Sequence, residues 1–348
     1  MIFRSYRGAG NMLVAILGFC LLGAAGAPEE AAPNEKPVKV VAGALITIRT
    51  AAGTGILPGY VSRDWSQPQP EITRAVLVFH GRLRNADVYW RSAQEAQAAA
   101  GAAQQTLMIV PQFLADDDVR AHASPVDFLH WSPAGWEGGA SAHGPIAISS
   151  FEAIDAILAR LADRSLFPNL TTVVVAGHSG GGQVVQRYAV VGRGEAALAS
   201  AGVHVRYVVA NPSSYLYFDD QRPVAAEASC ATVNQWKYGW PGAPAYAQAS
   251  SPQRYEQGYA GRDVVYLLGT ADTNPDHPAL DKSCAGEAQG PYRYARGLAY
   301  FAYLQQRNPA MTTQRIVPVE GVGHDGDAMF TSACGLSVLF DRAGCTSK

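Results

Sequence analysis

The sequence contains few charged residues and few cysteines. Of its 348 residues, 16% are charged and five are cysteine, and the formal net charge is −2 at pH 7. It has no basic stripe, so we expect no nucleic-acid partner. It has no C-x-x-C or H-E-x-x-H spacing, so we expect neither a metal site nor a cofactor. Nor does it contain an internal repeat. The oligomeric state and the natural substrate cannot be predicted from these features.

A hydrophobic run long enough to span a membrane is also missing. Arg4 and Arg7 precede an uncharged apolar stretch that begins at Met12 and gives way to small residues by Ala27. This layout is typical of a secretory signal peptide, which we place at residues 1–27. Pro28 leaves the cleavage point open, and an uncleaved anchor is the alternative. We therefore expect an exported protein, periplasmic or extracellular, without a stable membrane span after cleavage.

Four cysteines follow the predicted signal peptide. They are Cys230, Cys284, Cys334 and Cys345. An even number of cysteines in an exported chain indicates disulfide bonds, and four cysteines allow three pairings. Sequence proximity favours Cys334 with Cys345, which leaves Cys230 with Cys284.

Segments of strand and helix character alternate along the rest of the chain. Residues 28–37 are rich in Ala, Pro and Glu and predict a disordered lead-in, followed by a single domain over 38–348. The expected strands are 38–48, 74–80, 106–110, 171–175, 205–210, 264–268 and 314–319. The expected helices are 88–100, 151–161, 183–191, 292–305 and one that begins near 327. This alternation predicts an α/β fold with a mostly parallel central sheet flanked by helices.

The stretch TTVVVAGHSGGGQ, residues 171–183, is the strongest signal for chemistry. A run of β-branched residues ends in the pattern G-x-S-x-G, and a helical segment follows at once. Glycines allow the tight turn that such a serine occupies. The pattern makes Ser179 the candidate nucleophile, next to the amide of Gly180 at a helix N-terminus.

The loops after three other predicted strands supply candidate partners for Ser179. After the strand RAVLVFH comes Arg82, whose amide, with that of Gly180, would form an oxyanion hole. Leu83 is the alternative donor. Asp272 follows the strand at 264–268 and is the candidate acid, with Asp276, Asp281, Asp219 and Asp220 as alternatives. His324, in the Gly-rich loop after the last strand, is the candidate base.

Two long segments interrupt the alternation, residues 113–144 and the insertion at about 211–262. Both follow strands that end at the same edge of the sheet as Ser179, so we expect walls or a cap over the site. Trp131, Trp136 and Tyr215 are the candidate substrate-pocket residues. The alternative is that these aromatic residues only pack the segments. We expect His178 to be a packing neighbour and His80 to be structural, and we assign no role to His122, His130, His143 or His277.

The motifs FHGR at 79–82, GHSGG at 177–181, GTADT at 269–273 and GVGHDG at 321–326 occur in the order of the α/β-hydrolase superfamily. The chain resembles a secreted, esterase- or lipase-like member from about residue 38 to 340. The resemblance implies an ester hydrolase with Ser179, His324 and Asp272 as its triad, acting on a small-molecule or polymeric ester. A secreted peptidase or amidase, or a non-catalytic binding protein on the same scaffold, are the alternatives.

Overall fold

A computed structural model describes residues 1–3 and 34–345 of the chain. The chain divides into two units, Met1–Ala32 and Pro33–Lys348, and the described helices and strands all belong to the second unit. The predicted signal peptide, residues 1–27, lies outside the described residues except for its first three. Within the described part of the chain, no helix is long and apolar enough to cross a membrane.

The second unit is built on an eight-stranded sheet in the order β1-β2-β4-β3-β7-β8-β9-β10. The pairs β1–β2 and β2–β4 are antiparallel, and the remaining pairs are parallel. In chain order the strands are β1 (Ala44–Thr50), β2 (Gly53–Val61), β3 (Arg74–Phe79), β4 (Thr106–Pro111), β7 (Thr172–His178), β8 (His204–Ala210), β9 (Asp263–Gly269) and β10 (Gln314–Val319). The prediction of a mostly parallel central sheet is confirmed.

Strand β2 is absent from the sequence-based expectations. Its sequence, GTGILPGYV, contains Pro58 and three glycines, which are residues typical of turns. Pairing with β1 over residues 53–59 and with β4 over residues 59–61 holds it extended. A long partner strand, rather than local propensity, decides its conformation.

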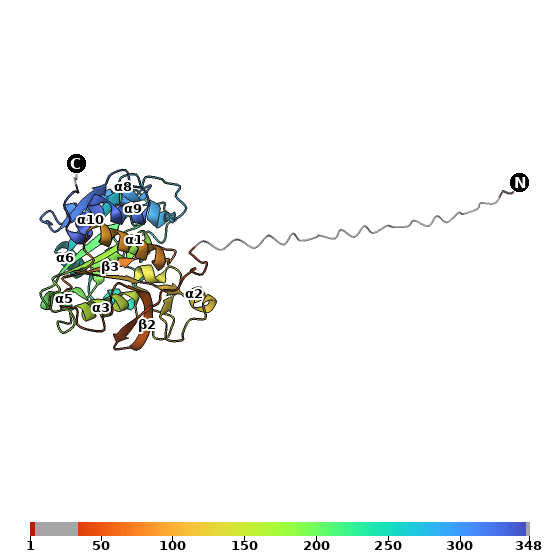
Figure 1. Ribbon diagram of the computed structural model, residues 1–348. Coiled ribbons are helices and arrows are strands. Elements are labelled where there is room, and N and C mark those ends of the chain that lie inside the picture. Colours follow the sequence, from red (N-terminus) through yellow and green to blue (C-terminus); the bar gives the residue numbers. More distant parts are fainter. Residues whose placement is uncertain (4–33, 346–348) are drawn as a thin grey trace. The chain divides into compact units, whose positions relative to one another are not determined.

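Helices cover both faces of the sheet (Figure 1). One apolar layer joins the sheet to α1, α9 and α10, and the other joins it to α3, α4, α5, α6 and α8. The helices are α1 (Ala86–Ala99), α2 (Asp116–Ala121), α3 (Ser150–Leu161), α4 (Gly180–Val191), α5 (Glu195–Ser200), α6 (Pro252–Ala260), α7 (Cys284–Glu287), α8 (Arg293–Arg307), α9 (Gly326–Thr331) and α10 (Ala333–Phe340). Short 3-10 turns occupy Gly135–Gly138 and Ala245–Ala249, and β5 (Leu114–Ala115) pairs with β6 (His130–Trp131).

The central strands are buried on both faces because their side chains alternate between the two apolar layers. In β3, Val76 and Val78 pack toward α1, whereas Leu77 and Phe79 pack into the opposite layer. Burying each such side chain contributes roughly 1.5–3 kcal/mol. This double burial explains the continuous apolar run that predicted the strand.

The predicted disordered lead-in, 28–37, is only partly within the described residues. In residues 34–37 the backbone is held by Arg84, a fully buried side chain that donates to the carbonyl oxygens of Asn34 and Lys36. Asp118 pairs with the same guanidinium at 2.6 Å. The amino-acid composition of residues 28–37 could not predict this attachment, because Arg84 binds backbone carbonyl oxygens of this segment and not its side chains.

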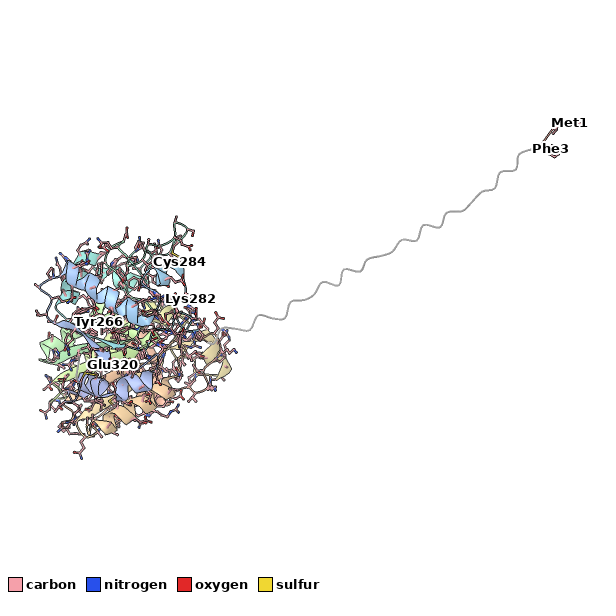
Figure 2. All side chains as sticks on the ribbon, turned by 90° about the horizontal axis from the view of Figure 1, so that it is seen from above. Met1, Phe3, Tyr266, Lys282, Cys284 and Glu320 are labelled. Carbon is pink, nitrogen blue, oxygen red and sulfur yellow. A yellow bond between two sulfur atoms is a disulfide. The ribbon has the colours of Figure 1, made fainter. Side chains whose placement is uncertain are left out.

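Two disulfide bonds join the cysteines of the second unit. Cys230 pairs with Cys284 and Cys334 pairs with Cys345, which is the pairing that sequence proximity favoured. The first bond ties the insertion at about 211–262 to the segment after β9. Figure 2 marks Cys284 beside Lys282, with Tyr266 of β9 in the interior.

Candidate active site

Ser179 lies at the sharp turn between β7 and α4. Its backbone has φ 58° and ψ −119°, a conformation that non-glycine residues rarely adopt. Its amide donates to the carbonyl of Ala210 on the neighbouring strand β8 at 3.0 Å, which holds the turn in place. The strained backbone places the serine above the carboxyl end of the sheet, where residues of parallel α/β proteins meet ligands.

The glycines around Ser179 are required by close backbone contacts. A Cβ on Gly181 would lie 2.1 Å from the carbonyl oxygen of Phe79, and a Cβ on Gly177 would lie 2.3 Å from that of Gly181. No side chain fits at either position without moving backbone. The G-x-S-x-G pattern is therefore explained by the geometry of strand, turn and helix.

His324 stands between Ser179 and Asp272. Its Nε2 lies 3.0 Å from Ser179 Oγ, and its Nδ1 lies 2.8 Å from Asp272 Oδ2. His324 comes from the loop after β10 and Asp272 from the loop after β9, so neighbouring strand ends deliver both. The Asp272 side chain is 2% exposed and that of His324 is 9% exposed. The structure thus brings together the three residues that the sequence singled out as nucleophile, base and acid.

Burial favours the neutral form of His324. Burial lowers the pKa of His324 below its ordinary value, although the hydrogen bond to Asp272 raises it; the cation of Arg293 lowers it further. Arg293 Nη1 lies 3.5 Å from Asp272 Oδ1, and burial lowers the pKa of Arg293 to about 10. A neutral imidazole with one nitrogen facing a hydroxyl is the form that can accept a proton.

The backbone amides of Arg82 and Gly180 lie close together beside Ser179. A Cβ on Gly180 would lie 2.9 Å from the Arg82 nitrogen, which shows how near the two residues approach. Gly180 is the first residue of α4, so its amide has no acceptor one turn earlier in the helix. Two amides so placed can stabilise negative charge on an oxygen bonded to Ser179 Oγ.

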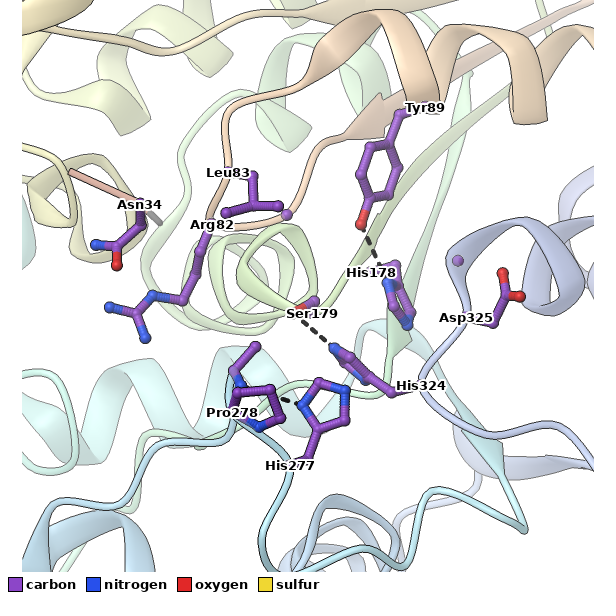
Figure 3. A pocket seen from close by; sticks show the side chains of 13 residues that line it. Asn34, Arg82, Leu83, Tyr89, His178, Ser179, His277, Pro278, His324 and Asp325 are labelled. Atoms are coloured by element: carbon purple, nitrogen blue, oxygen red, sulfur yellow. Dashed lines mark hydrogen bonds between the residues drawn. The ribbon is translucent and has the colours of Figure 1, made fainter. Parts of the chain in front are cut away.

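A cavity of about 490 Å³ opens at Ser179 (Figure 3). It is lined by Asn34, Gly81, Arg82, Leu83, Tyr89, His178, Ser179, His277, Pro278, Ala279, His324, Asp325 and Gly326. Its walls come from the segment before β1, the loop after β3, the β7–α4 turn, the loop after β9 and the loop after β10. The size is within the range of small-molecule sites in proteins.

Comparison with known proteins identifies the architecture. Neither a family model nor a curated protein matches the sequence. The solved structure of the poly(3-hydroxybutyrate) depolymerase LpqC from Bordetella parapertussis is similar, with a TM-score of 0.57 and 23% identity over 84% of this chain and 86% of that one. Poly(aspartic acid) hydrolase-1 from Sphingomonas sp. KT-1 gives a TM-score of 0.60 and 21% identity over 88% and 99%. The chain has the α/β-hydrolase fold.

Within the α/β-hydrolase fold, nucleophile, acid and base follow successive strands in the chain order Ser, Asp, His. Ser179 after β7, Asp272 after β9 and His324 after β10 have this order. The two similar structures are less than 25% identical to this chain, so they establish its fold. The chemistry of the site depends on its own residues.

The aromatic residues predicted for the substrate pocket do not line the cavity. Trp131, Trp136 and Tyr215 are each 0% exposed and belong to the apolar core. Trp136 stacks against Phe113 with ring centroids 5.4 Å apart, and Tyr215 stacks against Tyr300 at 4.5 Å. These three residues instead pack the long segments against the core, which was the alternative interpretation. The sequence could not separate the two because large aromatic residues serve both purposes.

The insertion at about 211–262 supplies none of the described residues that line the large cavity. It packs against α8, where Tyr217 contacts Tyr303 at a centroid distance of 4.7 Å, and its end forms α6. Lys237 and Tyr238 of the insertion border a smaller recess beside Arg82. The insertion therefore walls one side of the site.

Several cavity-lining residues were not foreseen from the sequence. His277 was given no role, yet its ring centroid lies 4.9 Å from that of His324, and its Nδ1 accepts from the Ala279 amide at 3.1 Å. Asn34 came from the predicted disordered segment. Tyr89, on the first turns of α1, places its hydroxyl 3.1 Å from Nδ1 of His178, whose ring packs on His324 at 4.5 Å. The sequence did contain one signal for His277, its position in the loop after the strand that carries Asp272.

A group of metal-ligand residues lies outside the cavity. Ligand atoms of Asp116, His130 and His143 fall within 4.8 Å of one another, and each could hold an ion through one atom. Hydrogen bonds also account for their approach, since Asp116 Oδ1 is 2.7 Å from His130 Nδ1 and 3.0 Å from His143 Nδ1. The sequence showed no metal spacing here because Asp116 begins α2, His130 lies in β6 and His143 lies in the loop that follows.

Proposed function

We propose that this α/β-hydrolase is a serine hydrolase that cleaves carboxylic esters through an acyl-enzyme. The observation that carries the proposal is the continuous chain from Asp272 through His324 to Ser179, at 2.8 and 3.0 Å. A serine at a strained turn, a neutral imidazole and a buried carboxylate are the groups that acyl transfer requires.

In the proposed reaction His324 Nε2 takes the proton of Ser179 as Oγ attacks the ester carbonyl. The charge that forms on the carbonyl oxygen is held by the amides of Arg82 and Gly180, and each such donor is worth about 3 kcal/mol. Asp272 stabilises the imidazolium, which then gives its proton to the leaving alcohol. Water attacks the acyl-enzyme in the same way and releases the acid.

We further propose that the enzyme works outside the cytoplasm. The predicted signal peptide at residues 1–27 and two disulfide bonds support this, because disulfides persist in oxidising compartments. The two similar structures carry names that describe polymer hydrolysis, one of a polyester and one of poly(aspartic acid). Both small esters and polymeric esters are therefore candidate substrates to compare.

Replacing Ser179 by alanine tests the mechanism. We expect Ser179→Ala to abolish turnover of p-nitrophenyl butyrate and labelling by a fluorophosphonate, because both need the nucleophile. Ser200→Ala is the matched control, since Ser200 is an exposed residue of α5 whose hydroxyl only bonds the Ala196 carbonyl. Wild-type turnover or labelling in the correctly folded Ser179→Ala protein, judged by circular dichroism, would disprove the assignment. Failure of wild-type enzyme on esters with activity on matched amides would favour an amidase.

A further inference from the structure

A second, smaller recess of about 140 Å³ adjoins the large cavity at Arg82. It is lined by Arg82, Glu137, Gln183, Ser213, Lys237, Tyr238 and Asp281. Arg82 also lines the large cavity, so the two spaces share one wall. A Cβ on Gly180 would lie 3.0 Å from Glu137 Oε1, which places this carboxylate next to the residue that follows Ser179.

Glu137 carries a buried oxygen without a partner. Its side chain is 0% exposed, and its Oε2 accepts from Lys237 Nζ at 2.7 Å. Its Oε1 has no hydrogen-bond partner among the described residues, and Arg82 Nε, at 3.7 Å, is too far away to be one. A buried acceptor left unpaired costs about 1–3 kcal/mol, and more when it is charged, so this oxygen calls for an explanation.

The charges around the recess cancel. Arg82 and Lys237 are the cations and Glu137 and Asp281 the anions among its lining residues. Asp281 already accepts from the Tyr238 hydroxyl at 2.7 Å. An ionic substrate group would disturb this balance, whereas a neutral group that donates a hydrogen bond would satisfy Glu137 Oε1 and leave the balance intact.

The position of His324 indicates which part of a substrate faces the recess. The leaving alcohol must lie near His324, because His324 returns a proton to it. His324 lines the large cavity but not the recess. In the view of Figure 3, Arg82 and His324 lie on opposite sides of Ser179. The leaving group then occupies the large cavity, and the acyl group extends toward the recess.

We infer that the enzyme selects esters of short acids that carry a neutral hydrogen-bond donor, a hydroxyl group, on the carbon atoms next to the scissile carbonyl. The hydroxyl donates to Glu137 Oε1 in the recess. An alkyl chain of the same size leaves that oxygen unpaired and is rejected, which is how sites built to bond a substrate hydroxyl discriminate. This inference rests on the proposed ester hydrolysis at Ser179.

Matched esters test the inference in the wild-type enzyme. Ethyl glycolate and ethyl 3-hydroxypropanoate differ from ethyl propanoate and ethyl butanoate by a hydroxyl in place of a methyl group, and hydrolysis is followed by pH-stat titration. We expect kcat/KM to be roughly 10- to 100-fold higher for at least one hydroxy ester than for its partner, as for a hydrogen bond to a charged group. Ethyl 3-methoxypropanoate, which cannot donate, should behave like the alkyl esters.

Glu137→Gln tests the role of the carboxylate. The single carbonyl oxygen of glutamine should stay with Lys237, which turns the amide NH₂ toward the recess and removes the acceptor. We expect the kcat/KM ratio of each hydroxy ester over its alkyl partner to fall to within about twofold. Glu152→Gln is the control, because Glu152 accepts from the Ser149 amide at 2.7 Å at the start of α3 and glutamine can do the same.

The outcomes separate this inference from the proposed function. Ester hydrolysis that depends on Ser179, without a preference between matched esters, overturns the inference alone. So does a preference that survives in Glu137→Gln, or a preference for the anion monoethyl succinate over both hydroxy esters. If no ester is hydrolysed, the proposed function and the inference both fail. Because the ester comparison uses the wild-type protein, it remains decisive even if Glu137→Gln does not fold.

Discussion

The Asp272–His324 pair and the Asp116 cluster both bring an aspartate against an imidazole, and they differ in almost everything else. Asp272 lies 2.8 Å from His324 Nδ1, and Asp116 lies 2.7 Å from His130 Nδ1 and 2.9 Å from His143 Nδ1. Asp272 and His324 have side chains 2% and 9% exposed, whereas Asp116 and His143 are 33% and 50% exposed. The same pair of residue types is buried in one region and solvated in the other.

The surroundings decide what each pair can do. The second nitrogen of His324 faces Ser179 Oγ at 3.0 Å, and burial lowers the pKa of its imidazole. At the other region the two imidazoles converge on one carboxylate. There, burial raises the pKa of Asp116, but the hydrogen bonds from His130 and His143 outweigh it, so the pKa is lowered. An acid–imidazole pair becomes a candidate catalytic device only with a nucleophile and a cavity beside it.

Removing one imidazole from each region should give the largest contrast. We expect His324→Ala to lower kcat for p-nitrophenyl butyrate by about 10⁴- to 10⁶-fold, because the serine loses its base. His143→Ala should keep kcat within about twofold of wild type, since His143 is half exposed and does not line the cavity at Ser179. Steady-state kinetics on both purified variants measure this contrast. Similar losses of kcat in the two variants would contradict the distinction between the regions.

Replacing each carboxylate by its amide is the next contrast. Asp272→Asn should reduce kcat by about 10⁴-fold, because the amide no longer fixes the tautomer of His324 or stabilises its imidazolium. Asp116→Asn should leave kcat within about twofold. The comparison uses the same ester and folded proteins checked by circular dichroism. An Asp272→Asn enzyme with near wild-type kcat would mean that another acid serves His324.

The pH profile should show the lowered pKa of His324. The base works only when neutral, and its pKa lies below the ordinary 6.5, so protonation begins only at lower pH. We expect the acid-side midpoint of kcat/KM to lie below pH 6.5, with a fall of about tenfold per pH unit beneath it. His143→Ala should leave the midpoint where it is. A midpoint at or above 6.5 in the wild-type enzyme would contradict the lowering of the His324 pKa by burial.

The smallest expected effect concerns stability at the solvated region. The lowered pKa of Asp116 means that its ionised form stabilises the fold above the ordinary pKa of 3.8, and that this contribution is lost as pH falls through the folded-state value. Asp116→Asn should lower the free energy of unfolding by up to about 1 kcal/mol at pH 7, with the difference shrinking below pH 4. Urea unfolding measures it. A larger loss would show that this region is a structural anchor.

The sequence was sufficient for the elements that have local signatures. The strands β3, β7 and β10, the turn at Ser179 and the capping box that starts α3 each carry their pattern within a few residues. The candidate triad could be predicted because strand ends in a parallel sheet meet at one edge. Strand β2 could not, since its extended form depends on pairing with β1.

Contacts between distant segments had no such signature. His277 reaches the cavity, Asn34 is held by Arg84, and Glu137 meets Gly180 only after the chain folds. Trp131 and Trp136 looked equally suited to a pocket or a core, and only their burial showed which.

The sequence by itself therefore determined the α/β architecture and the order Ser179, Asp272, His324, because strand periodicity and the tight turn at the serine are dictated by neighbouring residues. The tertiary structure alone decided which aspartate lies beside which imidazole, how far each is removed from water, and which carboxylate faces the nucleophile. Those properties depend on packing between segments far apart in the chain. Burial lowers the pKa of His324, and packing leaves Glu137 Oε1 without a hydrogen-bond partner among the described residues.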